Sequence, residues 1–598
     1  MGKIKKIRKR WYLIGGTRYT ILPGNILRYC MLPCLPKTIN FGSKNILLVF
    51  NVKKFALRFV LLLILCSVLV SLPEINIVRA SETIYIRADG SVEGTDKIQR
   101  NGNVYSFTGD ISDSIVIEKD DIVLDGKEYA LRGEGGGAKG ISLDGRNNVT
   151  IKNLQVRDFD TCIFLDNSSN NEISGNTLVS TLGWGTTWII QLKSFSNNNL
   201  ISGNTIRLES EWEDHAIDIR KSSYNTIVGN NITSNMYCIG LDNYTNHTTI
   251  TGNTLTSTNN WGWVNVWGKY NITFTNNILI RCSLNLYRSS HNTIEDNLVN
   301  NKPLVYLEDV SDQTVDYGGQ VILVNCNNMR VENLDLSDIT KGGVQLLYTN
   351  NTEISNYIGS LFFETSCHNR IIGSNCVELS FYRSSYNIIT GNTITNSRGH
   401  GFMLESSNNN NIYANNITAN RYSGIKLYNA LQGSHYSCFN NSIHGNNISK
   451  NAEGIILKYC VKTTNIIYEN NITNNHNAGV FVDGSYGNIL YSNNFVDNNR
   501  HVMGWDSTNV WDNGSEGNYW DDYNGMDTNH DGIGDSPYSI HINSHFPPGD
   551  IIDYDNYPLM TEFIIPEFPS WTPILLILIV LTVATAIYKR RLLKTPSR

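Results

Sequence analysis

The sequence predicts an all-β protein, a parallel β-helix of roughly fifteen coils, with an apolar segment near each end of the chain. A motif of the form Asn-x-Ile-x-x-Asn-x-Ile recurs, where its copies are clean, about every 23 residues, a period typical of repeat architectures. Apolar and polar residues alternate within each copy, which is the period of a strand. Good copies lie at residues 171–178, 199–206, 225–232, 387–394, 410–417, 441–448 and 465–472.

Each repeat contains a second short strand before the motif, for example at residues 163–166, 217–220 and 425–428. A small polar turn, often Ser-Ser-x-Asn, separates the two strands, because Ser and Asn side chains bond their own backbone. Two or three strands without a helix cannot bury an apolar side alone, so each unit must stack on the next. A propeller blade needs about 40 residues, and a leucine-rich repeat needs a Leu-rich pattern with helical segments. The parallel β-helix is therefore favoured.

The recurring asparagines have a structural explanation in this fold. Equivalent residues of successive coils lie about 4.8 Å apart, and at that spacing Asn amides bond one another in a ladder. We therefore expect the motif asparagines to hold the solenoid together and not to bind a ligand.

Interruptions of the repeat are the best places to search for function. The stretch 302–347 is less regular, and we expect a loop there. Two Trp-rich insertions lie near residues 184–188 and 261–267. Exposed tryptophans stack on sugar rings while Asn and Ser bond hydroxyls. The candidates for such a ligand platform are Trp184, Trp188, Trp212, Trp261, Trp263 and Trp267.

The two ends predict export and anchoring. Residues 1–80 are basic, contain an apolar run at 59–72 and end in Val-Arg-Ala, as in a secretory signal or an uncleaved anchor. Near the other end an apolar stretch precedes Lys589-Arg590-Arg591, which predicts a membrane-spanning helix with its basic tail inside. The predicted organisation is a signal or anchor at 1–80, an N-terminal β segment at 81–147, repeats at 148–500, a cap at 501–562, a linker at 563–571, a transmembrane helix at 572–590 and a tail at 591–598.

Composition limits the partners. The chain is mildly acidic, with 48 Lys and Arg against 54 Asp and Glu, which argues against nucleic acid. The eight cysteines from Cys162 to Cys460 lack zinc-type spacing. Cys162, Cys238 and Cys282 open equivalent strands and predict a buried thiol stack, while Cys367 with Cys376 is the first candidate for a disulfide.

After the last coil the composition changes to Asp, Gly and aromatic residues. Residues 527–535 follow the spacing of a calcium loop, with Gly532 at the sharp turn. The predicted ligands are Asp527, Asn529, Asp531, Asp535 and the carbonyl of Ile533. Tyr538 stands where such loops carry a bidentate Glu, so a carboxylate of Asp522, Asp553 or Asp555 would have to complete the shell. We expect structural calcium at the open end of the solenoid.

The chain resembles NosD-type proteins, a family described as periplasmic and copper-binding. The resemblance rests on Gly-Asn-Tyr-Trp at 517–520, DGIGDSPY at 531–538, DNYPLM at 555–560, residues 302–329 and the repeats. It implies a single-stranded right-handed parallel β-helix, a pectate-lyase-like solenoid shared by carbohydrate-binding proteins and sugar hydrolases. It also makes copper a candidate cofactor. The stretch IPEFPSW at 565–571 resembles the Pro-Glu-Phe C-terminal signals of archaeal surface proteins.

Three functions are compatible with these features. The favoured one is a membrane-anchored cell-surface protein that binds a polysaccharide or cell-envelope glycan, or has a structural role. A polysaccharide lyase or hydrolase is the second, since hydrolysis needs two carboxylates at fixed separation. Its candidate residues are Asp214, His215, Asp218 and His400, and the incomplete motifs favour binding over catalysis. The third is a copper-binding accessory protein. Its candidate ligands are histidines that are scattered over separate coils: His215, His247, His291, His400 and His444.

Overall fold

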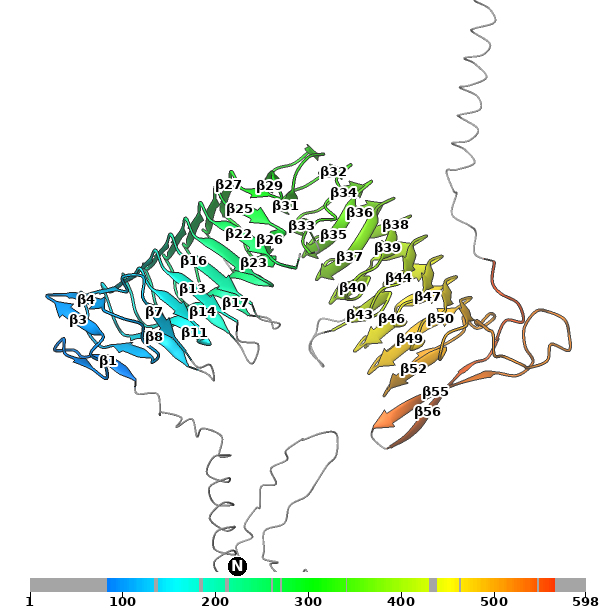
Figure 1. Ribbon diagram of the computed structural model, residues 1–598. Helices are drawn as coiled ribbons and strands as arrows, with labels where there is room; N and C mark the ends of the chain where they lie inside the picture. The colour runs from blue at the N-terminus through cyan, green and yellow to red at the C-terminus, as the bar shows by residue number, and fades with distance from the viewer. Residues whose placement is uncertain are drawn as a thin grey trace, which may run out of the picture. The chain divides into compact units, whose positions relative to one another are not determined.

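The computed structural model describes residues 83–133, 138–181, 187–209, 214–242, 244–259, 262–268, 271–339, 341–429, 438–461, 464–545 and 548–564. All of these residues belong to the larger of the two units into which the chain divides, Ala80–Arg598. The described residues form a right-handed parallel β-solenoid of about 17 turns, and all their regular elements are strands (Figure 1). The predicted all-β parallel β-helix is confirmed. The predicted helices within 1–80 and 572–590 lie outside the described residues.

Two ten-stranded sheets run along the first half of the solenoid. The first, in order of pairing, is β2 (Val92–Glu93), β1 (Ile84–Ile86), β5 (Ile115–Ile117), β8 (Lys139–Asp144), β11 (Thr161–Asp166), β14 (Trp188–Lys193), β17 (His215–Ile219), β20 (Tyr237–Leu241), β23 (Gly262–Trp267) and β26 (Cys282–Tyr287). The second is β3 (Ile98–Asn101), β4 (Val104–Phe107), β6 (Val123–Asp125), β9 (Thr150–Lys152), β12 (Glu172–Ser174), β15 (Leu200–Ser202), β18 (Thr226–Val228), β21 (Thr249–Thr251), β24 (Thr273–Thr275) and β27 (Thr293–Glu295).

A third ten-stranded sheet belongs to the second half, and a longer run of pairings joins both halves. The third sheet is β30 (Thr314–Val315), β32 (Arg330–Glu332), β34 (Glu353–Ser355), β36 (Arg370–Ile372), β38 (Ile388–Thr390), β41 (Asn411–Tyr413), β44 (Ser442–His444), β47 (Ile466–Tyr468), β50 (Tyr486–Tyr491) and β53 (Thr508–Val510). The long run begins with β7 (Ala130–Arg132), β10 (Gln155–Arg157), β13 (Thr177–Ser180), β16 (Thr205–Leu208), β19 (Asn231–Ser234), β22 (Thr254–Ser257), β25 (Ile278–Ile280), β28 (Leu298–Val299) and β29 (Lys302–Glu308).

From β29 the long run continues through β31 (Gln320–Val324), β33 (Val344–Leu347), β35 (Ile358–Glu364) and β37 (Asn375–Tyr382), and then divides, because β37 pairs with two strands. One branch is β40 (Phe402–Glu405), β43 (Ile425–Tyr428), β46 (Glu453–Lys458), β49 (Ala478–Asp483) and β52 (Val502–Trp505). The other is β39 (Thr393–Thr395), β42 (Asn416–Thr418), β45 (Asn447–Ser449), β48 (Asn471–Thr473), β51 (Asn494–Val496) and β54 (Tyr519–Trp520). An antiparallel hairpin of β55 (Tyr538–His545) and β56 (Pro548–Asp555) pairs with β52, the last strand of the first branch.

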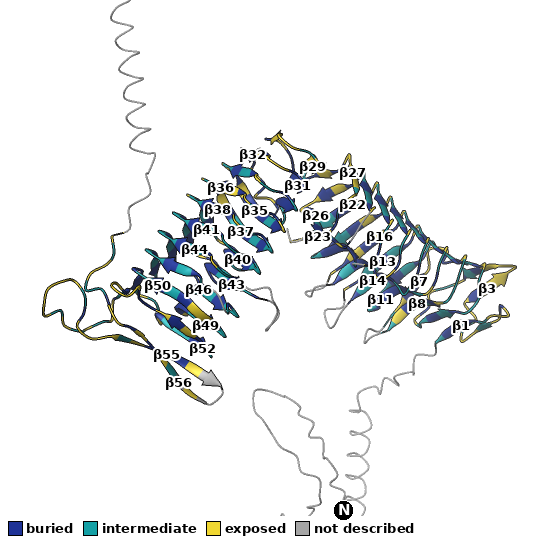
Figure 2. Cartoon of the chain, turned by 180° about the vertical axis from the view of Figure 1, so that it is seen from behind, coloured by how far each residue is buried: buried dark blue, intermediate teal, exposed yellow. Residues whose placement is uncertain are grey.

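Register is set by one apolar side chain per short strand. The central residue of each three-residue strand points inward and pairs with its equivalent in the next coil, so that the second sheet stacks Ile173, Ile201, Ile227, Ile250 and Phe274. A shift of one residue would turn each of these to solvent, which costs about 1.5–3 kcal/mol for each side chain. The burial pattern therefore fixes how the coils align. In Figure 2 dark blue runs through the stacked strands, and yellow is prominent in β3 and in the β55–β56 hairpin.

The motif asparagines form buried ladders, as the sequence predicts. In each link the side-chain amide of one Asn donates to the side-chain oxygen of the equivalent Asn in the next coil, at 2.9–3.0 Å along the second motif position. That oxygen also accepts the backbone N–H of the preceding Asn, for example from Asn415 to Asn446 at 3.0 Å. The ladders at this position are Asn176–Asn204–Asn230–Asn253–Asn277–Asn297 and Asn392–Asn415–Asn446–Asn470–Asn493–Asn518. The asparagines at the first motif position form a second ladder alongside this one, and its last members are Asn465, Asn488 and Asn509.

The residue before each ladder Asn turns the chain between two sheets. It has a positive φ, near 62° at Gly175, Gly203, Gly229 and Gly252, which is a left-handed conformation that Gly adopts without steric cost. Where Gly is absent, Asn276 and Asp296 adopt it, as expected for short polar side chains, and so do Ala414 and Glu469 before Asn415 and Asn470. The Gly-Asn pair of the motif is thus a turn followed by a ladder position.

Two buried carboxylates terminate the Asn ladders at the C-terminal end. Asp555 accepts the backbone N–H of Asn518 at 2.7 Å and the indole N–H of Trp520 at 2.9 Å. Asp553 accepts the backbone N–H of Asn509 at 2.8 Å and the indole of Trp511 at 3.2 Å. The expectation that Asp553 or Asp555 completes a calcium shell is wrong, because both side chains are buried against the last ladder asparagines.

The first ten-stranded sheet ends at β26, and side chains from the second half satisfy its free edge. Gln320 accepts the N–H of Leu284 at 3.0 Å and donates to its carbonyl at 2.7 Å. Gln345 accepts the N–H of Leu286 at 3.0 Å, and Glu364 accepts that of Arg288 at 2.8 Å. Amide and carboxyl groups therefore replace the next strand at this edge. The two hydrophobic clusters of the solenoid meet in the same stretch, around residues 315–347, where the sequence predicted an irregularity.

The eight cysteines among the described residues are free thiols. Of the predicted buried stack, Cys238 and Cys282 are together, with sulfurs 3.9 Å apart in the core, whereas the Cys162 thiol lies against the carbonyls of Val156 and Val179. The proposed Cys367–Cys376 disulfide is wrong. Cys367 lies in the half-exposed turn after β35, whereas Cys376 is buried on β37.

Replacing a ladder asparagine should destabilise the solenoid strongly. Asn446→Ala removes the amide that bonds Asn470, Ile412 and His444 and leaves the N–H of Asn415 without its acceptor. Because an unmade buried hydrogen bond costs about 1–3 kcal/mol, we expect a loss of about 3–5 kcal/mol, measured as a lower urea midpoint. Asn447→Ala is the matched control on the neighbouring half-buried position. An equal effect of both variants would contradict the ladder's role.

Protonation of the ladder terminus should stabilise the protein. Burial raises the pKa of Asp555 from 3.8 to about 6, although bonds from Asn518 and Trp520 lower it. A carboxyl with a raised pKa contributes stability that is complete below about pH 4 and is lost as the pH rises through 6. Two pKa units correspond to about 3 kcal/mol. We expect thermal stability to fall between pH 4 and 7, and Asp555→Asn to flatten that dependence. The same profile in wild type, Asp555→Asn and the exposed-site control Asp96→Asn would refute this assignment.

Candidate functional site

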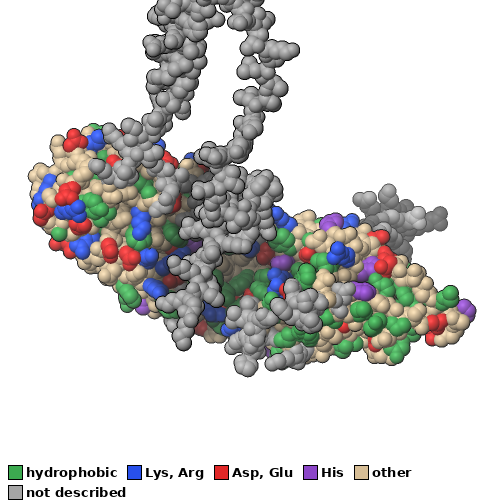
Figure 3. Space-filling view, turned by 90° about the horizontal axis from the view of Figure 1, so that it is seen from below, with side chains coloured by type: hydrophobic (Ala, Val, Ile, Leu, Met, Phe, Trp, Pro, Cys, Tyr) green, Lys and Arg blue, Asp and Glu red, His purple; other side chains and the backbone are tan. Residues whose placement is uncertain are grey.

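The candidate site lies on one outer surface of the solenoid, which we call the front face. It is the outward surface of β8, β11, β14, β17, β20, β23 and β26 and of β31, β33, β35, β37, β40, β43, β46, β49 and β52. Seen from below in Figure 3, hydrophobic, basic and acidic side chains and histidines are exposed on this side of the molecule. Strand alternation explains the chemistry, since residues between the buried positions of each strand point outward.

A pocket of about 220 Å³ opens on the front face where β26 meets the second half. Its walls are aromatic and come from both halves, with Trp263 and Trp267 on β23, Tyr287 on β26 and Phe362 on β35. The rings of Trp267 and Tyr287 lie 4.7 Å apart, and those of Tyr287 and Phe362 lie 6.3 Å apart. The pocket exists because side chains, and not another strand, follow β26 at this edge.

Polar groups lie between these rings. Lys341 places its ammonium 5.0 Å from the centre of the Trp263 ring and 3.8 Å from Glu378. Burial raises the pKa of Glu378, an effect that Lys341 opposes. Asn285 and Ser380 add an amide and a hydroxyl to the lining. The combination of ring faces with a few fixed donors and acceptors is typical of a small-ligand site.

A second, more open pocket adjoins the first. It has a volume of about 530 Å³ and is lined by His215, Asp218, Arg220, Tyr237, Asn265 and Trp267, among others. His215 stacks on Tyr237 with ring centres 4.5 Å apart, and burial lowers the pKa of this imidazole. Gly240 is required beneath it, because an added Cβ would lie 2.2 Å from the ring. Trp267 lines both pockets, and its side chain is 48% exposed.

Of the six tryptophans proposed for a ligand platform, Trp188, Trp263 and Trp267 are among the described residues. Trp188 on β14 lies in the same outward row as His215, Tyr237 and Trp263, which follow in register on β17, β20 and β23. The guanidinium of Arg220 lies 5.3 Å from the centre of the Trp188 ring. Trp184, Trp212 and Trp261 lie outside the described residues. Tyr287 and Phe362 extend the platform, but nothing in the repeat pattern distinguishes them from other outward residues.

The predicted catalytic residues do not assemble into one centre. Asp214 is buried and accepts the N–H of Thr187 at 2.8 Å, which holds a turn. Asp218 is buried, accepts a bond from Gln191 at 3.0 Å and pairs with Arg220 at 2.8 Å. His400 lies on a later coil beside Lys426, with 3.2 Å between Nε2 and Nζ. Asp214 and Asp218 are thus buried side chains with hydrogen-bond or ion-pair partners, and His400 lies on a separate coil.

His400 and Lys426 form a second polar group next to the first pocket. Burial, followed by the charge of Lys426, lowers the pKa of His400 to about 4, and burial also lowers the pKa of Lys426. The Nδ1 atom of His400 lies 2.8 Å from the Ser423 hydroxyl. Gly401 of the Gly-His-Gly sequence has a structural role, because a Cβ there would lie 2.6 Å from the ladder amide of Asn420.

The five histidines considered for copper do not converge. His215 and His400 have the partners described above, His247 stacks on Tyr224 at 4.7 Å, and His444 stacks on Tyr468 at 4.7 Å. His291 lies beside Ser290. Within the described part of the chain, the group of three or more metal-ligating side chains that converges is a different one, His501 with Asp521 and Asp522.

The calcium-loop residues fold inward upon their own backbone. The carboxylate of Asp527 accepts the N–H groups of Asp531 at 3.2 Å and Gly532 at 2.9 Å, and Gly532 has a φ of +86°. Asn529 accepts the N–H of Asp531 at 3.1 Å, and Asp535 accepts that of Thr528 at 2.9 Å. Hydrogen bonds from Thr528 lower the pKa of Asp535. Calcium binding by Asp527, Asn529, Asp531, Ile533 and Asp535 stays a prediction.

These observations define the class: a parallel β-solenoid with an aromatic, polar front face. The model of the family "Periplasmic copper-binding protein (NosD)" matches residues 80–266, 310–438 and 434–525, which together make up more than half of the sequence. The chain belongs to the NosD family. The family resemblance expected from the C-terminal cap and the repeats is thereby confirmed, and the family description names copper as the bound metal.

Comparison with curated proteins gives no match. Among solved structures, a double mutant of the periplasmic alginate epimerase AlgG is 12% identical, with 70% of this chain and 83% of that chain covered and a TM-score of 0.20. The A-module of the Azotobacter vinelandii mannuronan C-5 epimerase AlgE4 is 12% identical, covering 66% and 88%, also at 0.20. A mutant of the PL6 family alginate lyase AlyGC is 9% identical, covering 69% and 94%, at 0.20. These TM-scores are too low to support a conclusion.

The family description places its members in the periplasm. Among the residues that the structure describes, no helix has the length and apolar character needed to cross a bilayer. The predicted span at 572–590 lies outside the described residues, and so does most of the predicted linker at 563–571.

Proposed function

We propose that this protein is an extracellular β-helix protein that binds a polysaccharide or cell-envelope glycan across its front face. Residues 1–80 direct it out of the cell, and the apolar helix at 572–590 anchors it to the membrane with its basic tail inside. The export and anchoring rest on the sequence pattern alone.

The observation that carries the binding proposal is the position of Trp267. It stands between the two adjoining pockets with 48% of its surface exposed. A saccharide chain that lies along the front face would place one sugar ring on Trp267 and its neighbours in the two pockets. Aromatic rings supply the large apolar contact that the C–H face of a sugar needs.

The polar lining suits sugar hydroxyls. Asn265 and Asn285 face outward side by side on β23 and β26, with 3.1 Å between the amide nitrogen of Asn285 and the oxygen of Asn265. Lys341 donates, and Ser380 both donates and accepts. The polar groups fix the orientation of the ligand, whereas the aromatic rings supply non-directional apolar contact.

Binding is better supported than hydrolysis. A glycosidase needs two carboxyl groups on either side of the bond that is cleaved. Among the described residues that line the first pocket, Glu378 is the one carboxyl group. The second pocket is lined by two carboxylates, Asp218 and Asp242. Asp218 is paired with Arg220, and Asp242 accepts the backbone N–H of Lys221 and the hydroxyl of Thr245.

Removing the central ring should abolish most of the affinity. We expect Trp267→Ala to weaken binding of a responsive polysaccharide, found first by a glycan array with the wild-type protein, by at least about tenfold. That corresponds to about 1.4 kcal/mol, within what a stacked aromatic side chain contributes. Isothermal titration calorimetry measures the change.

Trp505→Ala is the matched control for this experiment. Trp505 lies at the end of β52 with 39% of its surface exposed, and it lines neither pocket. We expect its affinity to stay within about twofold of wild type. The proposal fails if no glycan binds the wild type, or if both variants lose affinity equally while their circular dichroism spectra match the wild type.

A further inference from the structure

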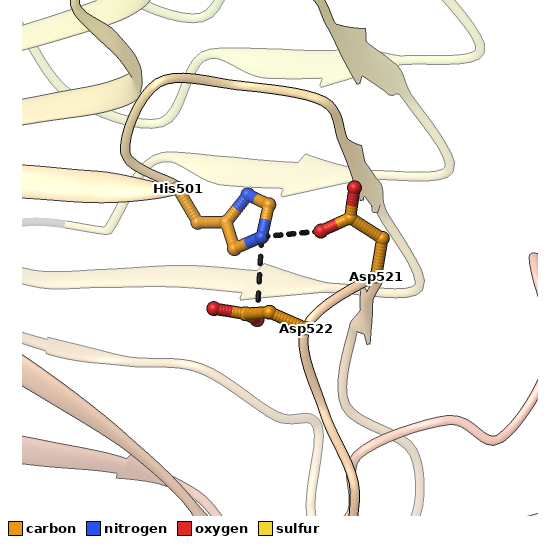
Figure 4. Close-up of side chains that lie close together, drawn as sticks. All are labelled: His501, Asp521 and Asp522. Carbon is orange, nitrogen blue, oxygen red and sulfur yellow. Dashed lines mark ion pairs between the residues drawn. The ribbon is translucent and has the colours of Figure 1, made fainter.

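A buried histidine faces two adjacent carboxylates near the C-terminal end of the front face. His501 immediately precedes β52, and Asp521 and Asp522 immediately follow β54 (Figure 4). The Nε2 atom of His501 lies 2.8 Å from Asp521 Oδ1 and 3.3 Å from Asp522 Oδ1. The His501 side chain is 7% exposed, and its Nδ1 atom has no hydrogen-bond partner.

The surroundings orient each of these three side chains. Asp521 accepts the backbone N–H of Asp497 at 2.6 Å through Oδ2, the oxygen that faces away from His501. Asp522 accepts the hydroxyl of Tyr538 at 3.2 Å, also through Oδ2. The imidazole packs against Phe495 and Trp520, with ring centres 6.0 and 5.8 Å away. In metal centres, the side-chain atoms that do not bind the metal are commonly held by hydrogen bonds of this kind, which orient the ligands.

We propose that His501, Asp521 and Asp522 bind one divalent first-row metal ion of the Zn²⁺ type. The ligand atoms of the three side chains lie within 4.8 Å of one another, and two carboxylates this close repel each other unless a cation lies between them. Ligand atoms around a tetrahedral ion with bonds of about 2.0–2.1 Å are about 3.3 Å apart. The observed separations of 2.8 and 3.3 Å therefore need little movement to accept such an ion.

The ligand set selects the ion. One imidazole with two carboxylates suits Zn²⁺ and its neighbours, whereas Ca²⁺ takes oxygen ligands alone. Three protein ligands leave a tetrahedral ion one open position, and a pocket of about 470 Å³ adjoins the group, lined by His501, Asp522, Tyr538 and His541, among others. The site shares no residue with the calcium loop at 527–535 or with the aromatic pockets. Asp522, which the sequence offered as a further calcium ligand, faces His501 and Tyr538 instead. It does not depend on the proposed glycan binding.

The test is titration of the chelator-treated protein with Zn²⁺ by calorimetry in the presence of excess Ca²⁺. We expect the wild type to bind one Zn²⁺ per chain, with no displacement by Ca²⁺. Asp522→Asn should weaken Zn²⁺ binding at least tenfold, and so should Asp521→Asn. Asp522 is the safer variant, because its side chain is 60% exposed and the amide keeps an acceptor for Tyr538.

Asp531→Asn in the calcium loop is the matched control, and we expect it to bind Zn²⁺ within about twofold of wild type. Circular dichroism of each variant verifies its fold. The proposal is overturned if the wild type binds no Zn²⁺, which would leave an ordinary His–Asp ion pair. It is also overturned if folded Asp522→Asn and Asp521→Asn bind like wild type, or if Ca²⁺ displaces the ion.

Discussion

The buried asparagine ladder is the interaction on which the rest of this structure depends. A solenoid coil offers the core only a few apolar side chains, so neighbouring coils need a further contact that fixes their spacing. Each ladder amide donates to the next amide along the axis and to backbone carbonyls of the preceding coil, and it accepts a backbone N–H. Because the group is buried, every missing partner would be costly. This demand for an Asn at the same place in each coil makes the sequence repetitive.

The same constraint leaves the outward positions free to differ from coil to coil. On the front face one outward row reads Trp188, His215, Tyr237 and Trp263, while the inward row beside it stays aliphatic. Chemical variety therefore collects outside, and recesses form where the stacking itself changes. At β26 the ladder of strands gives way to Gln320, Gln345 and Glu364, and the aromatic pocket opens beside them.

The sequence predicted what is periodic and local. Asn446 and its equivalents recur in a fixed pattern, so the ladder could be inferred without coordinates, whereas the turn at Gly175 and its equivalents was found only in the structure. Trp263 and Trp267 stood out as an interruption of the pattern. Tyr287, Phe362 and Glu378 could not be found in this way. They lie 20 to 115 residues from Trp263 and Trp267, and whether they are neighbours depends on how many coils the chain makes in between. Asp553 and Asp555 were misassigned to calcium for a related reason: in sequence they adjoin an acidic loop, whereas in space they end a ladder.

The C-terminal cap shows how the end of a repeat acquires its own chemistry. The last asparagines, Asn509 and Asn518, have no following amide, so the chain must supply acceptors of another kind, and Asp553 and Asp555 supply them. Burying two carboxylates requires donors, which explains the indoles of Trp511 and Trp520. Trp520 in turn packs against His501, a proposed metal ligand, and against Tyr538, which bonds a second one, Asp522. A cation between His501, Asp521 and Asp522 would then tie β52 to the segment after β54, where the stacking of coils ends.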